Sequence, residues 1–167
     1  GCVASNNFGN GILSSGNLSE CYSDLNAGIG LYATNRIQRS TATRSTDDGI
    51  HARVVTDSLA ARNSGPGIVA IERVARSLAI SNGQGILAPL IENSQVIGTF
   101  GSALAGEGAV NDSAILENAI ISSDTIQFNN TILAGNSGIT NLDQIDGMYI
   151  AGNEGGALLR REHLLDL

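Results

Sequence analysis

The sequence contains no lysine and no tryptophan, and it has only three tyrosines, three phenylalanines and two prolines among 167 residues. At 42% apolar residues the chain can still build one domain with a real core. That core has to be filled by small and aliphatic side chains, which argues against a conventional globular enzyme and favours a repetitive structure. The nine basic residues are all arginines, so the chain also lacks a lysine-rich patch for nucleic acid.

Positive charge is missing from a long part of the chain. Residues 1–80 hold seven arginines and six acidic residues, whereas residues 81–155 hold eight acidic residues and no basic one, and the net charge is −7. An acidic surface repels phosphate backbones and anionic lipids. We therefore expect no nucleic-acid partner.

Long apolar runs are also absent. No segment reaches the ~18 uninterrupted apolar residues of a membrane span, and the amino terminus lacks the basic start and apolar run of a signal peptide. We expect no membrane insertion. Because the sequence starts in mid-coil at Gly1 and Cys2, we expect its amino end to be joined to an upstream segment or stacked on another chain.

A repeat of about 18 residues runs through the chain. A glycine followed by aliphatic residues recurs in steps of 19, 19, 18 and 18 residues, at Gly11, Gly30, Gly49, Gly67 and Gly85. A hydroxyl residue recurs in steps of 18, 19, 17, 19 and 18 residues, at Ser40, Ser58, Ser77, Ser94, Ser113 and Thr131. Two independent columns thus share one period.

Each repeat also carries a finer beat of about six residues, as at Ile68, Val74, Ile80 and Ile86. Three six-residue segments per repeat predict a triangular coil with three short strands. Each coil stacks on the next in parallel register at about 4.8 Å. The predicted fold class is all-β, a parallel β-solenoid with triangular coils of about 18 residues. About seven coils fit between Gly11 and Ile139, which makes a rod about 35 Å long.

Three further columns fit this geometry. An apolar column is expected to line the interior, at Ala42, Ala60, Ala79, Val96, Ile115 and Leu133. An asparagine column is expected at a corner, where asparagine tolerates left-handed backbone and hydrogen-bonds to its own stack, at Asn63, Asn82, Asn118 and Asn136. A third column alternates in charge, as a ladder of stacked side chains requires, at Arg39, Asp57, Arg76, Asn93, Asp112 and Asn130.

The beat fades from Thr140, which divides the chain into a solenoid domain at 1–139 and a carboxyl-terminal segment at 140–167. Residues 153–156 are predicted to form a hinge, and residues 157–167 a short C-terminal helix. Leu158, Leu164 and Leu165 share one stripe of that helix. Its expected role is a cap over the last coil or an oligomer contact.

The unit Ser-x-Ala-x-x-Asn, at Ser58–Asn63 and Ser77–Asn82, resembles the head repeats of trimeric autotransporter adhesins. It is also similar to Ser/Ala/Gly repeats in fibrous proteins of phage tails and of bacterial spore coats. The likeness covers roughly residues 1–139, with longer coils than the adhesin heads have. It implies a trimeric, surface-exposed structure without catalysis, located outside the cell or on a virion surface.

A second resemblance is to the hexapeptide acyltransferases, which also wind triangular coils of eighteen residues. It is carried by aliphatic-glycine pairs such as Ile29–Gly30 and Ile97–Gly98, which are sparse here. That family implies a catalytic histidine at a subunit cleft, and the histidines available are His51 and His163. Asp47 and Asp48 precede His51 and could orient it as a general base, although an outward residue near a polar corner is the simpler interpretation.

Acidic residues suggest two other chemistries. Carboxylate pairs for glycan hydrolysis are Asp47/Asp48, Glu107/Asp112 and Asp143/Asp146, but so few aromatic residues leave few stacking platforms for sugar rings. Carboxylates that could hold Ca²⁺ are Asp112, Asp124, Asp143 and Asp146, for which a solvated acidic face is the preferred interpretation. We expect no catalytic, cofactor or metal site.

Cys2 and Cys21 lie 19 residues apart, which places them one above the other in neighbouring coils. They are either a disulfide or a pair of small hydrophobic residues.

Together these patterns predict a structural, surface-exposed segment of a fibrous assembly, such as a phage appendage, a spore-surface fibre or an adhesin head. The alternative is a surface-glycan hydrolase or lyase, or a carbohydrate-binding module, on a solenoid scaffold. We expect a homo-oligomer, with a trimer preferred over an end-to-end filament, because open solenoid ends and a short apolar helix need partners. A surface glycan is the remaining candidate ligand.

Overall fold

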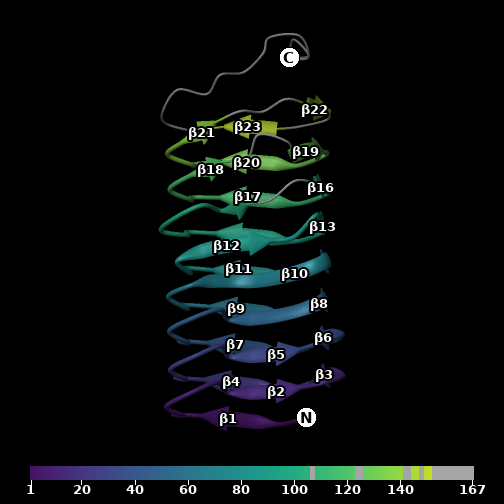
Figure 1. The fold of residues 1–167 in the computed structure, drawn as a ribbon. Coiled ribbons are helices and arrows are strands. Elements are labelled where there is room, and N and C mark those ends of the chain that lie inside the picture. Colours follow the sequence, from purple (N-terminus) through teal and green to yellow (C-terminus); the bar gives the residue numbers. More distant parts are fainter. Residues whose placement is uncertain (106–107, 123–125, 141–143, 147–148, 152–167) are drawn as a thin grey trace.

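The computed structural model describes residues 1–105, 108–122, 126–140, 144–146 and 149–151. These residues form parallel strands that stack into a β-solenoid of about seven turns, from β1 at one end to β23 at the other (Figure 1). The predicted all-β parallel solenoid is confirmed. The predicted helix at 157–167, with His163, lies outside the described residues. No helix within the described ranges is long and apolar enough to cross a membrane.

The strands form three columns along the rod, which we call face 1, face 2 and face 3. Face 1 consists of β1 (Val3–Ser5), β4 (Tyr22–Asp24), β7 (Thr41–Thr43), β9 (Leu59–Ala61), β11 (Leu78–Ile80), β14 (Gln95–Ile97), β17 (Ala114–Leu116), β20 (Ile132–Ala134) and β23 (Tyr149–Ala151). Face 2 consists of β2 (Ile12–Ser14), β5 (Leu31–Ala33), the first parts of β8 (Ile50–Thr56) and β10 (Pro66–Ala75), β12 (Gln84–Leu87), β15 (Leu104–Ala105), β18 (Ile121–Ser122) and β21 (Ile139–Thr140). Face 3 consists of β3 (Asn17–Ser19), β6 (Arg36–Gln38), the last parts of β8 and β10, β13 (Leu90–Glu92), β16 (Gly108–Asn111), β19 (Ile126–Asn129) and β22 (Gln144–Asp146).

Each strand pairs in parallel with its counterpart one coil later. On face 1, Ala60 pairs with Ala42 and Ala79, so the register follows the period seen in the sequence. Beyond Ile139, where that period fades, β22 still pairs with β19 and β23 with β20. The ladder therefore reaches Ala151, and the predicted boundary at residue 139 falls inside it.

Alternate side chains of each strand point into the rod and form its core. The predicted interior column of face 1 is fully buried from Ala42 to Leu133. Face 2 contributes Leu31, Ile50, Ile68, Ile86, Leu104 and Ile121, and face 3 contributes Leu18, Ile37, Val55, Val74, Ile91, Val110 and Phe128. Where face 2 turns inward, a Cβ at Gly49 would lie 2.4 Å from Asn63 Nδ2 and 2.6 Å from Gly67 O, which explains the glycine column.

The corners on either side of face 1 use left-handed backbone. One corner holds Glu20, Arg39, Asp57, Arg76, Asn93, Asp112 and Asn130, and the other holds Asn6, Leu25, Arg44, Arg62, Ser81, Gly98, Glu117 and Gly135. In the second corner the left-handed residue precedes the asparagine column, so the expectation that these asparagines themselves take that backbone was wrong. Ladder hydrogen bonds compensate the strain, as where Arg62 N donates to Ile80 O at 3.0 Å.

The asparagines do hydrogen-bond to their own stack, as predicted, and form a buried amide ladder. Asn63 donates from its backbone N and from Nδ2 to Asn82 Oδ1, at 3.0 and 2.9 Å. Asn82 Nδ2 donates in turn to the carbonyl of Ala60 at 3.0 Å. Buried polar atoms are therefore satisfied between coils rather than by solvent.

Candidate functional site

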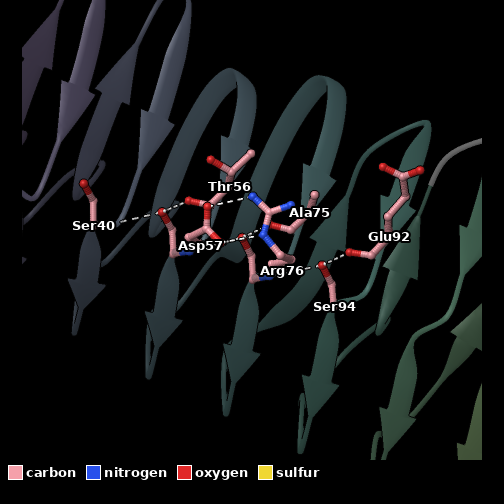
Figure 2. A network of polar contacts seen from close by, with 9 residues as sticks. Ser40, Thr56, Asp57, Ala75, Arg76, Glu92 and Ser94 are labelled. Carbon is pink, nitrogen blue, oxygen red and sulfur yellow. Dashed lines mark hydrogen bonds and ion pairs between the residues drawn. The ribbon is translucent and has the colours of Figure 1, made fainter.

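The hydroxyl column runs beside the first corner as a second ladder. The backbone N of Ser58 donates to Ser77 Oγ at 3.2 Å, and that of Ser77 donates to Ser94 Oγ at the same distance. Each hydroxyl also donates two residues back, as from Ser58 Oγ to the carbonyl of Thr56 at 2.8 Å. Figure 2 shows this ladder with the corner side chains next to it. The hydroxyl column is thus explained by coil-to-coil bonding.

The alternating charges predicted at this corner do meet. Arg76 binds Asp57 through two hydrogen bonds of 2.7 and 2.9 Å (Figure 2), and Arg39 pairs with Glu20 at 3.1 Å. The hydrogen bonds from Arg76 hold the pKa of Asp57 below its ordinary value. These side chains are largely exposed, so each pair contributes modestly to stability.

A carboxylate at the other corner, Asp24, also bonds to the neighbouring coil, and this contact was not predicted from the sequence. Asp24 accepts hydrogen bonds from Thr43 Oγ1 at 2.6 Å and from Arg44 Nε at 2.8 Å, and the side chain of Asp24 is only 10% exposed. These bonds, with that from Arg44 first, lower the pKa of Asp24. The spacing of 19 and 20 residues between Asp24 and its partners was the available signal.

His51 lies half-buried on the outside of face 2, between Tyr32 and Val69 of the neighbouring coils. Its Nδ1 is 2.9 Å from Asp48 Oδ2, and its ring centroid is 5.4 Å from that of Tyr32. His51 thus points outward, as the simpler interpretation expected, and the contact with Asp48 that the sequence allowed is present, with Asp47 exposed beside it. The carboxylate can fix the tautomer and orientation of the imidazole.

Among the other acidic candidates, Asp112 is the one whose side-chain contacts the structure describes. Asp112 Oδ1 accepts a hydrogen bond of 2.7 Å from Asn130 Nδ2, the next residue of its corner column. Glu107, Asp124 and Asp143 lie outside the described residues, as do the side-chain contacts of Asp146. Among the residues that the structure describes, no group of three or more His, Cys, Asp or Glu could hold a metal ion.

The two cysteines lie in neighbouring coils, as predicted, and both are free thiols. Cys21 is buried at the start of the hydroxyl column, where its backbone N donates to Ser40 Oγ at 3.1 Å. Cys2 is exposed. Cys21 therefore occupies a position that serine fills in later coils.

The outward side of face 1 carries no charged residue from β9 to β20. Its outward positions from β9 to β20 are Leu59, Ala61, Leu78, Ile80, Gln95, Ile97, Ala114, Leu116, Ile132 and Ala134. Most of them are half-buried by their own neighbours, while Ile132 is 45% exposed. The inward column of this face was predicted from the sequence, but the apolar outward one was not. We call the outward residues of β9, β11, β14 and β17 the face 1 patch.

No family model, no curated protein and no solved structure matches this chain. The resemblances to adhesin heads, phage and spore fibres, and hexapeptide acyltransferases therefore stay predictions.

Proposed function

We propose that this chain is a structural, surface-exposed segment of a fibrous assembly, such as a phage appendage, a spore-surface fibre or an adhesin head, and that it catalyses no reaction. In this proposal the solenoid is a stiff spacer that displays its faces. It acts as a homo-oligomer outside the cell or on a virion. The sequence favours a three-fold bundle over an end-to-end filament.

The observation that carries the proposal is the direction of the polar contacts. Of the six ion pairs among the described residues, five join neighbouring coils. The buried serine and asparagine ladders run the same way along the rod. Polar side chains are thus used to hold one coil on the next, which supports a load-carrying rod.

The alternative function is a glycan-binding or glycan-cleaving module. The observation in its favour is the group of Asp48, His51 and Tyr32, where an oriented imidazole lies beside an aromatic ring. Aromatic rings and oriented polar groups are the usual elements of sugar-binding surfaces.

A glycan array and a polysaccharide hydrolysis screen separate the two functions. We expect neither binding nor turnover by the full chain, and immunolabelling in electron microscopy should locate the protein on a cell or virion surface. Turnover abolished by Asp47→Ala or Asp112→Ala would overturn the structural proposal. Glycan binding without turnover, lost in His51→Ala but kept in the face 3 variant Arg36→Ala, would favour the binding module.

A further inference from the structure

The face 1 patch is a flat, regular apolar surface on a strongly acidic protein. Of the eight outward residues of β9, β11, β14 and β17, all of which the structure describes, Gln95 is the only polar one. Parallel in-register strands repeat these side chains at about 4.8 Å along the rod. Such a surface is complementary to another flat sheet with the same spacing, which packs on it at about 10 Å.

The charges at the ends of this patch are arranged for self-pairing. Arg62 directly follows β9 and Glu117 directly follows β17, so both lie on the same corner of face 1, at opposite ends of the patch. Both are exposed, and neither has an ion-pair partner in the described part of the chain. An unpaired cation and an unpaired anion therefore bracket the same apolar surface.

We propose that the face 1 patch binds a second copy of this chain, with the two rods antiparallel about a two-fold axis that runs along the strand direction. This arrangement places β11 against β14 and β9 against β17. Each strand of the patch then meets one strand of the other copy. Because a two-fold interface repeats every contact, Arg62 of each copy meets Glu117 of the other, and two ion pairs form.

The opposite rim of the patch is compatible with the same orientation. There the charge of Asp57 is balanced by Arg76, and that of Arg39 by Glu20, so the pairing places a neutral group against Asp112 of the other copy. More generally, the arginines are concentrated before residue 81, and residues 81–155 carry only acidic charges. Antiparallel rods oppose these two halves, whereas parallel rods place Asp112 beside Glu117 of the other copy.

The inference depends on the proposed structural function and replaces the three-fold bundle favoured by the sequence with a two-fold pair. Two flat faces close on each other about a two-fold axis, whereas three flat faces around one axis leave a hollow between them. The patch is about 10 Å wide and about 20 Å long, below the ~800 Å² per partner of a standard interface. We therefore expect a reversible pair that strengthens when chains are held together in a fibre, where the effective concentration is high.

Sedimentation equilibrium of the full chain over a concentration series tests the pair. We expect a monomer–dimer equilibrium, with the dissociation constant raised about tenfold by Arg62→Glu or by Glu117→Arg alone. The double variant should restore the dimer, because the two charges are exchanged. The matched control is Arg36→Glu, an exposed and unpaired arginine on face 3, which should leave the dissociation constant unchanged.

A second pair of variants tests the apolar surface. Ile80→Gln at the centre of the patch should weaken the dimer at least tenfold, whereas Leu87→Gln, an outward residue of face 2, should not. If the chain forms oligomers whose dissociation constant changes neither with Ile80→Gln nor with the charge reversals, the pairing is wrong, but the proposal of an oligomeric structural protein is not affected. A chain that stays monomeric at every concentration would also overturn the pairing, and the glycan screen would then decide the function separately.

Discussion

The coils up to β13 and the coils after it are built on the same three faces but use different corner chemistry. All six ion pairs among the described residues involve positions between Glu20 and Glu92. After β13, the equivalent contacts are made by amides, as where Asn129 donates to Asn111 at 2.7 Å and Asn130 to Asp112 at 2.7 Å. The first corner of the solenoid therefore accepts either charges or amides as complementary neighbours.

The core differs along the same direction. The face 1 column consists of alanines in the early coils and of Val96, Ile115 and Leu133 in the later ones. In the early coils face 2 provides a second buried residue, at Ala33, Ala52 and Ala70, whereas the equivalent Ala88 is only partly buried. The columns common to both regions, hydroxyl and aliphatic, define the fold.

The largest expected effect comes from the core of the later coils. Ile115→Ala should lower the free energy of unfolding by about 2–4 kcal/mol, because Ile115 is fully buried and its removal leaves a cavity. The outward neighbour Leu116→Ala should cost less than about 1 kcal/mol. Urea unfolding of both variants provides the measurement. Equal losses of unfolding free energy in Ile115→Ala and Leu116→Ala would contradict the assignment of the core volume to the inward column.

The next largest effect is expected in the buried amide ladder. Asn82→Ala removes the acceptor of two hydrogen bonds from Asn63 and the donor to the Ala60 carbonyl. Leaving these buried groups unpaired should cost about 2–3 kcal/mol in urea unfolding. The exposed amide Asn129→Ala should cost about 0.5 kcal/mol or less. A small loss of unfolding free energy for Asn82→Ala would mean that water takes over the hydrogen bonds of the missing amide.

A gain in stability is expected where the amide ladder is interrupted. Ser45 takes the place of an asparagine, and its buried Oγ has no hydrogen-bond partner, while Asn26 Nδ2 turns to Ser23 Oγ at 2.7 Å. The double variant Ser45→Asn with Ser23→Ala should restore the ladder toward Asn63. The free energy of unfolding should rise by about 1 kcal/mol, which thermal unfolding would detect as a higher midpoint temperature. Ser45→Ala should be nearly neutral. Destabilisation by the double variant would show that the early coils are too narrow for the amide.

The part of the fold that could be predicted from the sequence is the part that repeats. The hydroxyl and glycine columns gave the period, and the apolar column from Ala42 to Leu133 gave one inward side, because stacked coils place equivalent residues in register. The left-handed positions were shifted by one residue from the asparagines, since a corner needs both a backbone turn and a buried amide next to it. Asp24 escaped notice because its partners Thr43 and Arg44 do not belong to a repeated column.

The outward patch of face 1 was missed for a related reason. Its members vary between alanine, leucine, isoleucine and glutamine, so they form no sequence motif, and their common orientation appears only when the strands are placed. The His51–Asp48 contact was predictable because three residues separate the two side chains. Its surroundings, Tyr32 and Val69, come from other coils and required the register.

The smallest expected effect is a difference in acid sensitivity between the two regions. The pKa of Asp57 and that of Asp24 are lowered in the folded protein, below an ordinary value of 3.8, by hydrogen bonds from Arg76 and Arg44. The stabilisation from these bonds is therefore complete well above pH 3.8 and is lost as the pH falls through and below that value. Hydrogen exchange at pH 3 should then show earlier opening in the coils up to β13 than in the amide-linked coils after it. Asp57→Asn should flatten the acid dependence, whereas Asp112→Asn, at the same corner but bonded to Asn130, should change it little. Uniform opening of both regions at pH 3 would show that the ion pairs contribute nothing measurable, which is the limiting case for exposed pairs.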